Sequence, residues 1–193
     1  SARKINLELI LSNHNYDCKN CSREGQCELE KLAKAYKVNP EKFKGEKTTF
    51  IFDNSSPSII RDNSKCILCK KCVQVCKSFQ TVNAIGEINR GFNTQIGCAF
   101  NNGLNLTNCV ACGQCIMACP TGALRENENI TEVENLLKTT SIHKIIAPAP
   151  AVRVAIQEAY GITDTSLAEK LLVSGLKKLG FDKVFDVNFS ADL

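Results

Sequence analysis

The sequence predicts an α+β fold built from three small parts, at residues 1–47, 48–138 and 139–193. Two observations lead to this expectation. All 12 cysteines lie in the first two parts, in closely spaced groups. The last part has no cysteine and alternates between helical and strand-like patterns, which is typical of a mixed α/β domain.

Residues 1–47 are expected to contain two helices. The opening residues, "SARKINLELILSNHNYDC", carry Ile5, Leu9 and Leu11, which indicate an amphipathic helix. The stretch "CELEKLAKAYKV" at 27–38 indicates a second helix, which should end near Pro40. One histidine and three cysteines lie between the two helices.

Short strands are expected in the second part. The stretch "TTFIFDNSSPSIIRDN" at 48–63 reads as a β-strand and turn, with Asn54–Pro57 as the break. The stretch "GEINRGFNTQI" at 86–96 suggests a hairpin. It lies between two long runs of cysteines, which carry most of the chemistry of this part.

The third part reads as strand, helix, helix, strand. The strands are "KIIAPA" at 144–149 and "KVFDVNF" at 183–189, and a capping box of Ser166 and Glu169 should begin the second helix. Gly180 should end that helix, after Lys177 and Lys178 at its negative end. The apolar residues expected to share one helical face are Leu167, Leu171, Leu172, Leu176 and Leu179. This pattern is too short to close a sheet, so we expect only the opening of a mixed α/β domain.

The cysteine content narrows the class of protein. A chain of 193 residues with 12 cysteines and no tryptophan is usually a secreted disulfide scaffold or an intracellular metal protein. Repeated cysteine runs favour metal binding, because disulfides do not need such spacing. No secretory signal is seen, and no apolar run approaches the roughly 20 residues of a membrane span. We therefore expect reduced thiols in a cytoplasmic, oxygen-poor setting, with no membrane association.

Two cysteine runs form an internal repeat. "CILCKKCVQVC" at 66–76 and "CVACGQCIMACP" at 109–120 share the spacing Cys-x2-Cys-x2-Cys-x3-Cys. In two-cluster ferredoxins with this spacing, the first three cysteines of a run hold one 4Fe–4S cluster and the fourth holds the other. We expect each fourth cysteine to begin a helix. Zinc, the alternative, generally uses two separated Cys-x2-Cys pairs.

The repeat assigns eight cysteines to two clusters. Site 2 consists of Cys66, Cys69, Cys72 and Cys119, and site 3 consists of Cys76, Cys109, Cys112 and Cys115. Pro120 suits a sharp exit after the second run, whereas Lys77 stands where such a proline often lies in the first. Cys98 lies outside both runs and is expected to be a buried thiol without a metal.

The stretch "HNYDCKNCSREGQC" at 14–27 predicts a third cluster. Its three cysteines need one more ligand, and a histidine lies just upstream, so we assign site 1 to His14, Cys18, Cys21 and Cys27. A neutral imidazole in place of a thiolate should raise the reduction potential of that cluster. The alternative fourth ligand is Cys98, which would require a long-range approach.

The net charge does not indicate nucleic-acid binding. The formal charge of +4 treats every cysteine as neutral. Eleven thiolates and three oxidised 4Fe–4S cores would lower it to about −1. The basic excess is therefore mostly counter-charge for thiolates, and no nucleic-acid partner is expected.

The motifs together resemble the accessory electron-transfer region of clostridial-type FeFe hydrogenases. The shared pattern is His-x3-Cys-x2-Cys-x5-Cys followed by the two runs, and related layouts occur in large iron–sulfur subunits of complex I and of some formate dehydrogenases. The stretches "APAPAVRVAIQEAYG" at 147–161 and "LKKLGFDKVFDVNFSADL" at 176–193 resemble the opening of the FeFe hydrogenase catalytic domain.

This resemblance implies reversible H2 oxidation and proton reduction, with ferredoxin or a similar carrier as electron partner. Ala149, Pro150 and Ala151 would line the pocket of the H-cluster, a 4Fe–4S cluster joined to a di-iron centre. The cysteines that ligate the H-cluster, and the 2Fe–2S domain found upstream in many members, are not in this sequence. The three filled clusters would carry electrons to the remainder of the catalytic domain, and the segment alone would be inactive.

Two other functions stay open. The chain could be an iron–sulfur relay of a formate or NADH dehydrogenase, which would leave the stretches at 147–161 and 176–193 unexplained. It could also be a polyferredoxin-type electron carrier, which would not need the long cysteine-free third part.

Overall fold

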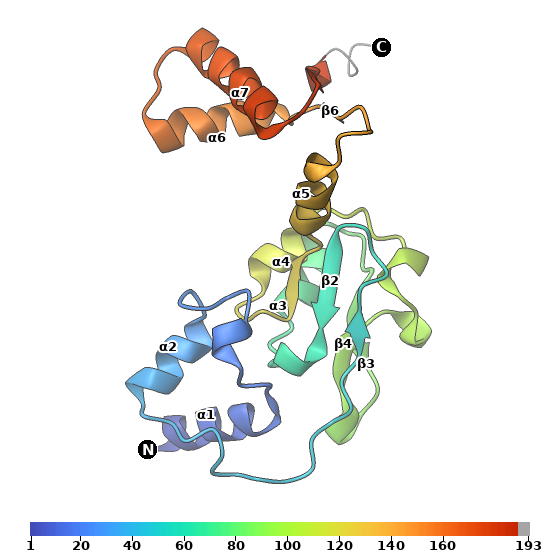
Figure 1. Cartoon of the computed structure of the whole chain (residues 1–193). Helices are drawn as coiled ribbons and strands as arrows, with labels where there is room; N and C mark the ends of the chain where they lie inside the picture. The colour runs from blue at the N-terminus through green and yellow to red at the C-terminus, as the bar shows by residue number, and fades with distance from the viewer. Residues whose placement is uncertain (189–193) are drawn as a thin grey trace. The chain divides into compact units, whose positions relative to one another are not determined.

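The computed structural model describes residues 1–188 and divides the chain into two compact units, Ser1–Glu128 and Asn129–Leu193 (Figure 1). Both units mix short helices with small sheets, in agreement with the predicted α+β class. The finer division at residues 47 and 138 stays a prediction.

The first unit contains four α-helices among its described elements. They are α1 (Ala2–Asn13), α2 (Glu28–Ala35), α3 (Lys71–Gln74) and α4 (Gln114–Ala118). Its strands are β1 (Phe52–Asp53), β2 (Ile59–Asp62), β3 (Gly86–Ile88), β4 (Gln95–Gly97) and β5 (Leu124–Glu126). The predicted second helix is thus confirmed, and it ends before Pro40 as expected.

Helix α1 is confirmed, and of the three apolar residues that indicated an amphipathic helix only Leu11 is buried. Ile5 and Leu9 are 46% and 51% exposed, whereas Leu7 and Leu11 are buried against Leu29 and neighbouring residues of α2. The buried side of α1 also carries an ion pair: the buried carboxylate of Glu8 lies 2.7 Å from the Lys42 ammonium.

Two small antiparallel sheets organise the rest of the first unit. Strand β2 lies between β1 and β5, and the turn predicted at Asn54–Pro57 separates β1 from β2. The hairpin predicted at 86–96 is confirmed as β3 and β4, which pair antiparallel. Helix α4 packs on α3 and β5. The core between these elements is formed by aliphatic side chains and by cysteines of both runs.

The second unit contains α5 (Ile130–Lys138), β6 (Ile145–Ile146), α6 (Pro150–Tyr160), α7 (Thr165–Leu179) and β7 (Lys183–Val184). The predicted order of strand, helix, helix and strand is confirmed, and β6 pairs parallel with β7. The second strand is shorter than predicted, because residues 187–188 are helical. Phe189, the last residue of that predicted strand, lies outside the described residues.

Helix α7 begins and ends on caps, but the predicted capping box is wrong. The N-cap is Asp164, whose carboxylate accepts hydrogen bonds from the backbone N–H groups of Ser166 and Leu167. Because the Asp164 carboxylate already satisfies these two donors, the Ser166 side chain has no capping role. The Glu169 carboxylate pairs with Arg153 instead of with the start of the helix. The C-terminal cap is Gly180 at φ 110°, as predicted.

The apolar face of α7 is only partly covered within the second unit. Leu167, Leu171 and Leu179 are exposed, although the sequence predicts that they face a core. An apolar groove of about 1120 Å³ runs between α7 and α6, with Ile156 on one wall and Leu176 on the other.

Candidate iron–sulfur centres

The two cysteine runs begin with the same backbone conformation. The third and fifth residues of each run have positive φ, at Leu68 (54°) and Lys70 (62°) in the first and at Ala111 (53°) and Gly113 (74°) in the second. Such left-handed residues curl a short chain segment into a loop. The sequence repeat is therefore also a structural repeat, in which the first and second cysteines lie on one curled loop.

The helices of this repeat begin earlier than predicted. Lys70 and Gly113 are the N-caps of α3 and α4, so each helix starts after the second cysteine of its run rather than at the fourth. Cys76 lies in a π-helical turn, Val75–Phe79, that continues α3, and Cys119 caps the end of α4. The prediction that the fourth cysteine begins a helix is wrong. Instead, about one helical turn, or roughly 6 Å of rise, carries the fourth cysteine away from the third.

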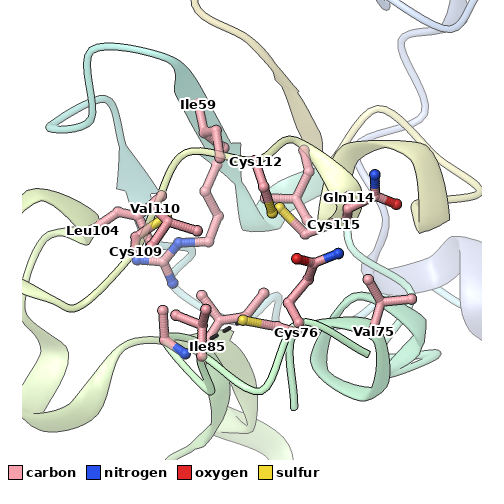
Figure 2. Close-up of a pocket in the computed structure, with 15 residues that line it drawn as sticks. Ile59, Val75, Cys76, Ile85, Leu104, Cys109, Val110, Cys112, Gln114 and Cys115 are labelled. Atoms are coloured by element: carbon pink, nitrogen blue, oxygen red, sulfur yellow. Dashed lines mark hydrogen bonds between the residues drawn. The ribbon is translucent and has the colours of Figure 1, made fainter. Parts of the chain in front are cut away.

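The four cysteines of site 3 line one cavity. It encloses about 480 Å³, part of it open to solvent, and is otherwise mostly apolar. Figure 2 shows Cys76 across the cavity from Cys112 and Cys115. These cysteines come from both runs, in the exchange that the spacing predicts.

The four cysteines of site 2 line a second cavity, whose space, including the part open to solvent, is about 380 Å³. Cys66, Cys69 and Cys72 come from the first run and Cys119 from the second, so the exchange is reciprocal. Cys69 is exposed, whereas Cys72 and Cys119 are buried. Each thiolate of a 4Fe–4S cluster binds a different iron, so a cavity with sulfurs around its wall suits this cofactor. Among the described residues, no three His, Cys, Asp or Glu side chains converge on a point that would hold a single metal ion.

The environment of these cysteines disfavours a free thiolate, so their sulfurs are expected to be either protonated or bound to a cluster. Burial, with the neighbouring thiols, raises the pKa of Cys66 to about 11, that of Cys72 to about 12 and that of Cys115 to about 11. Such thiols stay protonated near neutral pH until a metal displaces the proton.

Backbone amides are directed at two of these sulfurs. The N–H of Leu68 donates to Cys66 Sγ and that of Ala84 donates to Cys76 Sγ, each at 3.4 Å. Hydrogen bonds of this kind stabilise the negative sulfurs of iron–sulfur clusters.

Site 1 is a cluster of three thiols with a buried imidazole upstream. Cys18, Cys21 and Cys27 lie close enough to interact electrostatically, and burial, with Glu30 and these two neighbouring thiols, raises the pKa of Cys18. His14 follows the end of α1 and is 8% exposed. Burial, with the nearby Lys65, lowers the pKa of His14 to about 4, so its imidazole is neutral at pH 7.

One ring nitrogen of His14 is available as a ligand. Nδ1 is buried and has no hydrogen-bond partner within the part of the chain that the structure describes. A buried polar atom without a partner is costly, and a metal ligand bond would satisfy it. The charged groups that influence His14 are Lys65, Asp62 and Lys47, with none of the three thiols among them, so its approach to these thiols stays a prediction.

Site 1 packs directly against the segment that carries the last ligand of site 2. Cys27 Sγ lies 3.7 Å from the carbonyl oxygen of Pro120, the residue after Cys119. A Cβ atom added at Gly122 would lie 2.8 Å from Cys21 Sγ. The two sites therefore share a wall.

Cys98 is completely buried in the main core of the first unit. Its charged neighbours are Arg61 and Asp53, and the thiols that influence it are Cys109 and Cys76 of site 3. It therefore lies near site 3 rather than with the thiols of site 1.

A buried ion pair near these cavities was not identified from the sequence. Arg61 and Asp53 are cross-strand partners on β2 and β1, and Arg61 Nη2 lies 2.9 Å from Asp53 Oδ2. Arg61 lines both the site 2 and the site 3 cavity. The sequence feature that could have revealed this pair is the arginine inside the apolar strand "SIIRDN". Its partner, however, depends on which residues of β1 and β2 lie opposite each other.

The residues proposed to line an H-cluster pocket lie at the start of α6. Ala149 is the N-cap of this helix and Pro150 its first residue. Both border a groove of about 660 Å³ that also contacts Arg153 and Val184. Ala151 is exposed and is not part of that groove.

No helix in residues 1–188 is both long and apolar enough to cross a bilayer.

Family comparisons match three ranges of the chain. Residues 3–41 match the NADH-ubiquinone oxidoreductase-G iron–sulfur binding region, and residues 104–125 match the 4Fe–4S binding domain. Residues 142–193 match the C-terminal domain of the iron-only hydrogenase large subunit. The first two ranges contain the cysteines of site 1 and the second cysteine run.

Similar proteins include two hydrogenases. The chain is 40% identical to NADP-reducing hydrogenase subunit HndD of Solidesulfovibrio fructosivorans and 36% identical to iron hydrogenase 1 of Clostridium pasteurianum. These matches cover 100% and 98% of the chain but only 33% of each relative. The chain thus spans about one third of the length of these relatives.

Other similar proteins share less of the chain. The NADH-ubiquinone oxidoreductase 75 kDa subunit of Dictyostelium discoideum is 31% identical over 64% of the chain and 18% of the relative. A crystal structure of an NAD+-reducing [NiFe]-hydrogenase in the H2-reduced state matches with a TM-score of 0.58 and 27% identity, over 65% of this chain and 53% of that one. Over almost its whole length the chain is therefore similar to the iron–sulfur region of FeFe hydrogenases, and residues 142–193 match the C-terminal domain of the iron-only hydrogenase large subunit.

Proposed function

We propose that this chain is the electron-relay segment of an FeFe hydrogenase that catalyses reversible H2 oxidation and proton reduction. Three 4Fe–4S clusters at sites 1, 2 and 3 would exchange single electrons between a carrier such as ferredoxin and an H-cluster ligated by residues outside this chain. The observation that carries this proposal is the coincidence of each predicted four-cysteine set with one cavity.

The residues of sites 2 and 3 suit this cofactor, and site 1 offers three thiols with His14 as the candidate fourth ligand. At sites 2 and 3, the buried thiols and the backbone N–H donors to sulfur suit a cluster with negative sulfurs. At site 1, the neutral imidazole of His14 has a nitrogen without a partner among residues 1–188. Cys98 lies away from the thiols of site 1, which favours His14 as the fourth ligand there.

The contacts between the sites support an order for the relay. Site 1 contacts the Pro120–Gly122 segment beside site 2. Sites 2 and 3 share Arg61 and Leu124 as wall residues. The order is therefore site 1, site 2, site 3. Electrons from ferredoxin enter at site 1, or through an upstream 2Fe–2S domain if the full protein has one.

The second unit would contribute to the catalytic domain rather than to the relay. Its match to the iron-only hydrogenase large subunit starts at residue 142, and the groove between α6 and α7 is apolar and open. An apolar face of this kind suits burial under the remainder of the catalytic domain, on the same polypeptide or on a companion chain. Ala149, Pro150 and Ala151 would then line the H-cluster pocket.

A relay of an NADH or formate dehydrogenase is the second candidate. Matches to an NADH-ubiquinone oxidoreductase subunit and to an NAD+-reducing hydrogenase support it over about two thirds of the chain. It does not account for the hydrogenase-type match over residues 142–193. A polyferredoxin-type carrier has the same weakness.

The ligand assignment is tested by comparing two cysteine variants of anaerobically prepared full-length protein. Cys76→Ala should remove or convert the cluster at site 3, seen as loss of one electron paramagnetic resonance signal, and should lower H2-dependent viologen reduction. Cys98→Ala, which also removes one thiol beside the same cavity, should keep all the clusters. Loss of a cluster in Cys98→Ala but not in Cys76→Ala would contradict the assignment.

A further inference from the structure

The side chain of Arg61 is a buried cation at the wall between sites 2 and 3. It is 4% exposed and borders both cavities. Leu124 is the other residue that lines both cavities, and it carries no charge. Arg61 is therefore the charged side chain common to the two walls.

Two hydrogen bonds hold the guanidinium in place. Nη2 donates to Asp53 Oδ2 at 2.9 Å, and Nη1 donates to the carbonyl oxygen of Ile96 at 2.5 Å. Gly97 leaves the space for this arrangement, because a Cβ atom there would lie 2.9 Å from Arg61 Nη1. Such a fixed cation does not have to reorganise when a nearby charge changes.

The counter-ion of Arg61 does not line either cavity. Asp53 is in neither wall, and its carboxylate accepts hydrogen bonds from the backbone N–H groups of Ser55 and Leu104. The positive member of the pair is therefore the one that borders sites 2 and 3.

The guanidinium also has an unsatisfied donor. Nε is buried and has no hydrogen-bond partner in residues 1–188. A buried charged donor without a partner is destabilising unless a nearby negative charge compensates for it. An oxidised 4Fe–4S core with four thiolates carries a net charge of about −2 and would supply that charge on either side.

We propose that Arg61 raises the reduction potentials of the clusters at both site 2 and site 3, and that Asp53 limits this rise. Reduction adds one electron, taken from the carrier, to a cluster core without making or breaking a bond. A fixed positive charge stabilises the added negative charge, and the low dielectric of the buried wall strengthens this effect. The inference rests on the ligand sets of the proposed function.

Variants of the two partners should shift the potentials in opposite directions. In Arg61→Gln, the ratio of reduced to oxidised cluster at sites 2 and 3 should fall about tenfold at a fixed potential, which corresponds to about 59 mV for one electron. In Asp53→Asn the cation stays and its counter-charge is lost, so the same ratio should rise. Arg61→Lys keeps the charge and should stay close to the wild type.

The measurement is a redox titration of anaerobic full-length protein, followed by electron paramagnetic resonance. Site 1 is the internal control, because Arg61 is not among the charges that influence His14. Because Arg61 is buried, the shifts should not depend on ionic strength. Shifts of the same sign in Arg61→Gln and Asp53→Asn, or no shift relative to site 1, would overturn the inference.

If Arg61→Gln does not hold its clusters, Asp53→Asn alone tests the inference. A rise in the ratio of reduced to oxidised cluster in that variant supports the inference, and any other result overturns it. Absence of the clusters from the wild-type protein would instead overturn the proposed function, so the two failures are distinguishable.

Discussion

Gly122 lies against the sulfur of Cys21, and its replacement by alanine tests whether that sulfur is held by iron. A Cβ atom at position 122 would lie 2.8 Å from Cys21 Sγ and 3.2 Å from Ser22 Oγ, whereas ordinary contacts begin at 3.4 Å. The methyl group therefore forces the Cys21 sulfur to move. A free thiol would rotate away at little cost, but a thiolate bound to iron cannot rotate without straining its bond.

Gly122→Ala is therefore expected to destabilise the cluster of site 1. Overpacking of a rigid site costs about 1–3 kcal/mol, which corresponds to a roughly 5- to 150-fold faster loss of iron to a chelator. The assay follows the decay of the site 1 electron paramagnetic resonance signal after a chelator is added anaerobically. Signals from sites 2 and 3 in the same sample report whether the effect is local.

Gly45→Ala is the matched control, because a Cβ atom at Gly45 would meet no atom within 4 Å. It should lose iron at the wild-type rate. If Gly122→Ala also keeps its site 1 cluster at the wild-type rate, then the Cys21 sulfur is not fixed by iron and the ligand set of site 1 is wrong.

Three further predictions concern single side chains. His14→Cys should keep the site 1 cluster but lower its potential, because a thiolate adds negative charge, whereas His14→Ala should lose or degrade it; a redox titration that shows no shift for His14→Cys would refute this ligand. Asp164→Ala should destabilise α7 by about 1 kcal/mol in urea unfolding, whereas Ser166→Ala should not, and equal effects would favour the capping box instead. Burial alone would raise the pKa of Asp53, but hydrogen bonds from Ser55 and Arg61 lower it from 3.8 to about 2. The stability that the Asp53 charge contributes is thus present above pH 3.8 and is lost as the pH falls toward 2, so wild type and Asp53→Asn should converge in free energy of unfolding over that range.

Local patterns in the sequence were sufficient to predict the cavities and most of the elements. The Cys-x2-Cys-x2-Cys-x3-Cys spacing paired the cysteines that line each cavity, because short spacers leave the chain few ways to arrange them. The hairpin at 86–96 and the order of elements in the second unit followed from turn residues and periodicity. These features depend on residues close together in the chain.

Features that depend on distant residues could not be predicted in this way. The Glu8 carboxylate on the buried side of α1 pairs with Lys42, which is 34 positions away, and periodicity alone could not show this contact. The contact of Gly122 with Cys21 joins the two ends of the first unit. The N-cap at Asp164 was missed for a local reason: it stands two residues before Ser166, and its carboxylate accepts from the backbone N–H groups of both Ser166 and Leu167.

The central claim is that this chain holds three 4Fe–4S clusters, and the metal and sulfide content of the anaerobically prepared chain tests it most directly. About twelve irons and an equal amount of acid-labile sulfide per chain, without zinc, are the expected result. Stoichiometric zinc, or an iron content near eight or below, would contradict it.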